Sequence, residues 1–137
     1  MNTIKSMLFA VVILTITVGT SMAQISKDDY KVLNYTTAIE NGKPLEKNLL
    51  LKNDENVIAN VTLRDGKSLG MHTEDNAFWV AATAGSGQLI LGKNEKVIEL
   101  KPGTIVTVNP GIPHDVVAKP DLSILVIKFL DGKGKKK

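Results

Sequence analysis

The segment KPGTIVTVNPGIPHDVV, residues 101–117, decides the fold. It begins with a Pro-Gly turn at Pro102-Gly103 and continues into a short apolar stretch, 104–108. A second, rigid loop, 109–113, contains two prolines and a glycine and leads directly into His114. Because proline and glycine restrict the chain to turns, this segment predicts two short strands, 104–108 and 114–118, joined by a tight loop.

The same alternation of short strands and turns continues on both sides of this segment. Turn residues recur every 8 to 12 positions or so, which is typical of a β-sandwich or barrel. The sequence predicts strands at 31–36, 49–51, 57–63, 68–73, 78–83, 88–91, 97–100, 104–108, 114–118 and 122–130. No convincing amphipathic helix is found after residue 23, so the predicted fold class is all-β.

Two of these strands predict how their faces are buried. Segment 57–63 places Val57, Ala59, Val61 and Leu63 on one face, because side chains alternate along a strand. Segment 122–130 is almost continuously apolar, as expected for a strand covered on both faces. Its outer side would allow a homodimer, with Lys128 interrupting one face.

The stretch from residue 66 to residue 129 resembles the small single-domain cupins. The cupin pattern has a first motif with Gly, His-x-His and a later Glu, and a second motif with Pro-Gly, an apolar strand and a Pro-x-x-x-His turn. Here the first motif reads GKSLGMHTEDNAFWVAATAGSGQL, residues 66–89, and the second is the segment quoted above. The resemblance implies a double-stranded β-helix, or jelly-roll, barrel.

The first motif departs from the cupin pattern. His72 takes the first histidine position, but Glu74 stands where the second histidine is usual. The later glutamate falls near Ala77, and no carboxylate lies between Ala77 and Gly85. Of the four metal ligands that the resemblance implies, two are retained, one is exchanged and one is lost.

The retained residues predict a site inside the barrel. His72 and Glu74 are two positions apart, so on a strand they share a face, and His114 can converge on them from another strand. Two imidazoles and one carboxylate form a facial triad that suits one divalent metal ion, namely iron, manganese or zinc. The alternative is a cupin without metal, in which His72 and His114 contact a small ligand directly.

Trp79 is the only tryptophan in the chain. Counted by twos from Ala77, it is predicted to face the cavity beside Ala81 and to bind a ligand with its flat ring. The alternative is that Trp79 fills the core. The same alternation places Asp115 away from His114, while Arg64 is assigned to a solvated loop.

The N-terminus has the layout of a secretory signal peptide. Lys5 precedes the apolar run 7–18, and Ser21 and Ala23 occupy the −3 and −1 positions of a cleavage site. The run is too short to span a membrane, so no stable membrane anchor is expected after cleavage. The predicted organisation is a leader over 1–23, an N-terminal segment 24–47, a cupin barrel 48–131 and a basic tail 132–137. The protein is expected to be exported, either to a periplasm or to the medium.

Composition excludes several functions. The chain has no cysteine, so disulfides, thiolate ligands and thiol nucleophiles are excluded. Its net charge is +3, but four of its lysines lie in the last five residues, and the chain has one arginine. Nucleic-acid binding is therefore not expected.

Two functions remain. The first is an exported module that binds a small ligand in the barrel, with or without a divalent metal. The second is a small metal-dependent enzyme, an oxygenase, isomerase or lyase, that uses His72, Glu74 and His114 as a facial triad. A fold of this kind hosts many functions, so the resemblance does not decide between them.

Overall fold

The structure is a computed structural model that describes Gly19 and residues 23–131. Most of the predicted leader and the basic tail 132–137 lie outside the described residues. The chain divides into two units, 1–31 and 32–137. The described part of the first unit is exposed and holds one turn, in which the Asp29 amide donates to the Ser26 carbonyl. No helix among the described residues is long and apolar enough to cross a membrane.

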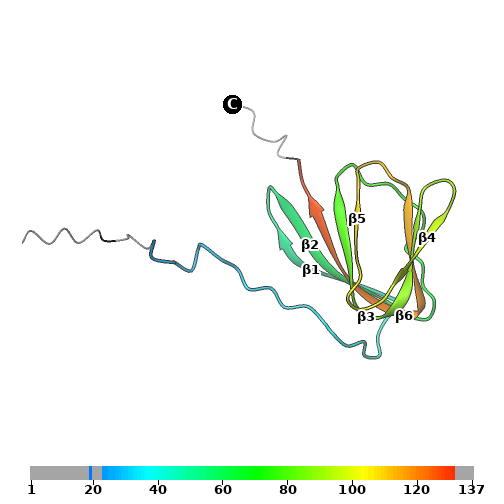
Figure 1. Cartoon of the computed structure of the whole chain (residues 1–137). Coiled ribbons are helices and arrows are strands. Elements are labelled where there is room, and N and C mark those ends of the chain that lie inside the picture. The colour runs from blue at the N-terminus through cyan, green and yellow to red at the C-terminus, as the bar shows by residue number, and fades with distance from the viewer. Residues whose placement is uncertain (1–18, 20–22, 132–137) are drawn as a thin grey trace, which may run out of the picture. The chain divides into compact units, whose positions relative to one another are not determined.

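The second unit is built from β-strands, and the all-β prediction is confirmed (Figure 1). The strands are β1 (Leu45–Lys52), β2 (Asn56–Leu63), β3 (Phe78–Leu91), β4 (Lys96–Leu100), β5 (Ile105–Val108) and β6 (His114–Phe129). They pair antiparallel in the order β1-β2-β6-β3-β4, and β5 also pairs with β3. Two long strands, β3 and β6, therefore form the centre of the sheet.

Both long strands pass through positions where the sequence predicts breaks. The glycine-rich stretch 85–87, between the predicted strands 78–83 and 88–91, lies inside β3, and residues 119–121, between the predicted strands 114–118 and 122–130, lie inside β6. The β3–β6 register shifts between Ala82 and Ala84 and again between Gly85 and Gly87, so these residues form bulges in a continuous ladder. Bulges bend a strand without ending it, which is why four predicted strands are two.

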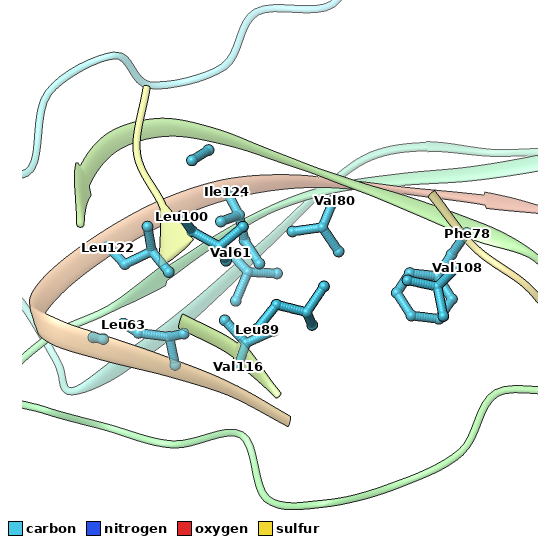
Figure 2. Close-up of a cluster of buried hydrophobic side chains, with 12 residues drawn as sticks. Val61, Leu63, Phe78, Val80, Leu89, Leu100, Val108, Val116, Leu122 and Ile124 are labelled. Atoms are coloured by element: carbon cyan, nitrogen blue, oxygen red, sulfur yellow. The ribbon is translucent and has the colours of Figure 1, made fainter. Parts of the chain in front are cut away.

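The register defines which side chains face inward. Val61 pairs with Ile124, Leu63 pairs with Leu122, and Val80 pairs with Val126, so apolar side chains from β2, β6 and β3 share one face. Figure 2 shows this core, with Leu63 and Leu122 towards one end and Phe78 and Val108 towards the other. The largest fully buried apolar side chains are Leu63, Leu89, Leu100, Leu122, Ile124 and Val80. The predicted inward face of 57–63 is confirmed.

Two predicted strands are absent from the described chain. Segment 31–36 forms no strand; instead, the Thr36 amide donates to Oδ1 of the buried Asn60 on β2. Segment 68–73 makes only two isolated bridges to β6, at Ser68 and at His72. Short stretches of this kind lack the paired ladder that defines a strand.

Arg64 is buried rather than solvated. Its Nε donates to the Glu40 carbonyl at 2.8 Å, and its Nη1 donates to the Lys43 carbonyl at 2.7 Å. The guanidinium also pairs with Glu46 at 3.3 Å. Through these hydrogen bonds and this ion pair, Arg64 connects the segment before β1 to the end of β2.

Candidate functional site

A cavity of about 400 Å³ lies on the inner side of the barrel. Most of its wall is apolar, and its polar side chains are two histidines, one glutamate and two lysines. The lining residues are Lys47, Val57, Ala59, Val61, Leu69, His72, Glu74, Phe78, Val80, His114, Val116, Ile124, Val126 and Lys128. This volume and this mixture of apolar walls with a few polar groups are typical of small-molecule sites.

The structure brings His72 and His114 together in this cavity. Their backbones form an antiparallel bridge, with the His72 amide 2.9 Å from the His114 carbonyl and the His114 amide 2.8 Å from the His72 carbonyl. The ring centroids are 4.3 Å apart, and the His114 ring also lies 4.4 Å from the Phe78 ring. Because residues directly opposite each other share a face of the sheet, the bridge directs both imidazoles into the cavity.

Hydrogen bonds fix the orientation of both imidazole rings. His72 Nδ1 donates to the Gly70 carbonyl at 2.7 Å, and His114 Nδ1 donates to the Ile112 carbonyl at 2.8 Å. In a neutral imidazole whose Nδ1 carries the proton, Nε2 is an acceptor. Both rings therefore present an unprotonated Nε2 when neutral.

The pKa of His114 lies below the usual 6.5, chiefly because the ring is buried. The Ile112 carbonyl opposes this shift, and the nearby His72 adds to it. Burial disfavours the charged imidazolium, and the nearby Glu74 and Lys128 act on the His114 pKa in opposite directions. His114 is accordingly neutral at pH 7.

Asp115 supports the site from the other side of β6. Its carboxylate accepts a hydrogen bond from Ser68 Oγ at 2.6 Å and another from the Gly70 amide at 2.9 Å. Gly70 is the residue whose carbonyl binds the ring of His72. Asp115 thus positions His72 through the 68–70 turn, although it points away from His114 as the alternation predicts.

Glu74 lies at the same end of the cavity. One of its oxygens is 4.0 Å from His72 Nε2 and 2.5 Å from the ammonium nitrogen of Lys128. The Glu74 carbonyl accepts a hydrogen bond from the Gly111 amide at 2.8 Å, which ties the two sequence motifs together. The three predicted metal ligands therefore gather in one cavity.

Their arrangement does not fit a bound divalent ion. The Glu74 carboxylate is already neutralised by Lys128, so the anionic donor of the predicted triad is engaged by a cation of the chain itself. Among the described residues, no three His, Asp or Glu side chains are grouped so that they could hold a metal ion. Lys128, which the sequence indicates only as a break in an apolar face, is the cation that engages this carboxylate.

Lys128 faces inward because of its register. It pairs with Val57 on β2 and with Phe78 on β3, both of which line the cavity. The signal was present in the sequence: Ile124 and Val126 precede it at intervals of two. Because the residues between them are also apolar, the sequence alone does not reveal which residues of this strand point inward.

Trp79 does not line the cavity. It is 41% exposed, and its ring packs edge-on against Phe129 at 5.1 Å. Phe78 and Val80 face inward instead, so the prediction is wrong by one residue of register. Trp79 therefore neither forms a wall of the cavity nor fills the core. The buried alternation of Phe78, Val80 and Ala82 is the pattern that identifies the inner face.

Known structures with the same fold support this architecture. The chain is similar to an RmlC-like cupin from Desulfovibrio desulfuricans, with 21% identity and a TM-score of 0.64 over 73% of this chain and 96% of that one. It is also similar to an RmlC-like cupin with a double-stranded β-helix fold from Methanocaldococcus jannaschii, with 19% identity and a TM-score of 0.62 over 77% of this chain and 94% of that one.

A third similar structure is an enzyme. This is the DMSP lyase DddQ from Ruegeria pomeroyi, with 18% identity and a TM-score of 0.59 over 66% of this chain and 49% of that one. At these identities the three similarities establish the cupin double-stranded β-helix fold.

A search of curated proteins found no match to the sequence. The family model of AraC-like ligand-binding domains matches residues 63–131, which is half of the chain. This match spans β3 to β6 and every residue of the His72–Glu74–His114–Lys128 cluster. The chain therefore belongs to the family of AraC-like ligand-binding domains within the cupin superfamily.

Proposed function

We propose that this protein binds a small organic molecule in the barrel cavity, without a resident metal ion. The observation that carries the proposal is the cavity itself: it has a volume of about 400 Å³, its walls are mostly apolar, and its lining includes two oriented imidazoles and an ion pair. The ligand has an apolar body that lies against the walls and a polar head that meets His72 and His114. Such a division of contacts gives affinity through burial and specificity through a few polar groups.

The alternative of a metal-dependent enzyme needs the Glu74 carboxylate as a metal ligand. In the structure this carboxylate is paired with Lys128, and no other observation favours catalysis. The binding function is therefore the better supported of the two.

The proposal is tested by filling the cavity. Isothermal titration calorimetry would measure a panel of small carboxylates, amides, amines and sugars, including phenylacetate and its amide, against the chain and two variants. Ala59→Leu adds a larger side chain to the cavity wall on β2. Ala81→Leu makes the same change on β3, on the face of that strand that points away from the cavity. We expect binding to be lost in the first variant and kept in the second. Equal binding by both would place the ligand elsewhere, and no binding from the whole panel would contradict the proposal.

We also propose that the ligand is met outside the cytoplasm. The support is the leader-like sequence 1–23, with its apolar run and its Ser21-Met22-Ala23 cleavage signal. Expression of the full chain in a bacterium, followed by fractionation and mass spectrometry, should yield an exported form that begins at Gln24. An intact chain retained in the cytoplasm would contradict export.

A further inference from the structure

We infer that Lys128 supplies the cation of this site. Its ammonium group neutralises Glu74 in the place where a metal-binding barrel would hold a divalent ion, and it selects ligands with an anionic head. The second half of this inference rests on the proposed function, whereas the first half concerns the protein without ligand.

The Lys128–Glu74 pair differs from an ordinary surface ion pair. Lys128 projects from the inner face of β6 between Val57 and Phe78, and its side chain is 31% exposed, while that of Glu74 is 24% exposed. The two groups belong to segments 54 residues apart that meet only in the folded barrel. An ion pair that is partly desolvated and held by the fold is harder for another cation to displace than a mobile ion pair in water.

The pair also opposes metal binding directly. A divalent ion at the two Nε2 atoms would lie next to the Lys128 ammonium and would need the carboxylate that this ammonium holds. Two neighbouring positive charges repel each other strongly in a cavity that is partly shielded from water. Removal of Lys128 should therefore free Glu74 and create the three-donor site that the sequence predicts.

The charges around the cavity favour an anion. Its lining contains two lysines, Lys47 and Lys128, against one carboxylate, Glu74. The ion pair leaves Lys128 with further ammonium donors, since one of three is used. A carboxylate head can accept these donors, and a hydroxyl or N–H beside it can donate to the Nε2 acceptors. The ligand class is thus a small organic acid with an apolar body.

The decisive experiment is a zinc titration. The chain contains only two histidines and no cysteine, so imidazole ligands exist nowhere else. Tag-free protein, Lys128→Met and Lys47→Met would be titrated with Zn²⁺ by calorimetry, with circular dichroism to verify folding. Lys47→Met removes the same charge from the lining of the same cavity, and it controls for a general electrostatic effect.

We expect Lys128→Met to bind one Zn²⁺ about tenfold or more tightly than the unmodified chain, and Lys47→Met to change little. Adding His72→Ala to Lys128→Met should abolish the gain. If the unmodified chain binds Zn²⁺ as tightly as Lys128→Met, or if Lys47→Met gains equally, the inference is overturned. Lys128→Gln, which keeps a polar side chain, replaces Lys128→Met if that variant does not fold.

The anion preference is measured with acid and amide pairs, such as phenylacetate with phenylacetamide and mandelate with mandelamide. The acids should bind more tightly than their amides, and this preference should disappear in Lys128→Met. Amides that bind as tightly as their acids would refute the anion preference. If neither member of any pair binds, the proposed function fails, while the zinc result still decides the role of Lys128.

Discussion

His72 and His114 lie directly opposite each other in an antiparallel bridge, with their imidazole ring centroids 4.3 Å apart. The two residues are distant in sequence, yet two backbone hydrogen bonds fix their relative position. Backbone hydrogen bonds therefore position both imidazole rings in the cavity without any contribution from a ligand. Pre-formed sites of this kind lose little entropy on binding.

Acid should destabilise the protein through His114. Because burial lowers its pKa in the native state, the unfolded chain binds a proton more readily than the native chain does. The free energy of unfolding should therefore fall as the pH drops through about 6.5, the usual histidine value, towards the lower native pKa. Urea unfolding at several pH values should show a shallower decline in His114→Gln than in the unmodified protein. An identical decline in both would contradict the assignment to His114.

Asp115 should matter for both stability and ligand binding. Asp115→Ala removes the acceptor of Ser68 Oγ and one of the two acceptors of the Gly70 amide, and we expect a loss of about 1–3 kcal/mol in unfolding free energy. Because Gly70 orients the His72 ring, the NMR signals of that ring should shift as well. Ser68→Ala removes the hydroxyl that donates to Asp115 and accepts from the Gly70 amide, but it keeps the carboxylate as an acceptor for that amide, so its effect on the His72 signals should be smaller. Unchanged His72 signals in Asp115→Ala would refute the positioning role.

Core packing should dominate stability. Leu89 is fully buried in the core, whereas Leu49 is 58% exposed on β1. Leu89→Ala should lower the unfolding free energy by about 2–5 kcal/mol, because it leaves a cavity among close-packed side chains. Leu49→Ala deletes the same atoms and should change it by about 0.5 kcal/mol or less. Equal losses, measured by urea unfolding, would show that the burial of these two leucines is misassigned.

The bulge at Gly85 should tolerate no side chain. Gly85 has a φ of 71°, and a Cβ atom there would overlap the Asp121 carbonyl on β6. Gly92 has a similar φ of 73° but faces open space. Gly92→Ala should therefore cost about 1 kcal/mol from backbone strain alone, and Gly85→Ala should cost clearly more. Thermal unfolding of both variants measures this difference, and equal shifts would mean that the close approach is unimportant.

Much of the fold can be predicted from the sequence, because turn residues and the alternation of side chains along a strand depend on local sequence. The inward face of β2 follows directly from Val57, Ala59 and Val61. The continuity of β3 through Gly85 does not, because a bulge and a turn have the same composition. Only the partner strand β6 decides between them.

The candidate site was predictable to a similar extent. The cupin-like motifs correctly indicate that His72, Glu74 and His114 lie in one cavity. Alignment of the first motif through Ala77 places Trp79 on the wrong face, because this chain lacks the usual glutamate at that position. Lys128 was missed because it lies outside both motifs, and its direction depends on pairing with Val57 and Phe78.

The strand β6 carries His114 at its start and Lys128 near its end, and both side chains line the same cavity. A ligand that touches both residues would join the two ends of one strand. Occupancy would then stabilise the native state and raise the unfolding temperature, and this stabilisation would grow with the logarithm of the ratio of ligand concentration to Kd. In this protein, the free energy of ligand binding would therefore also stabilise the folded barrel.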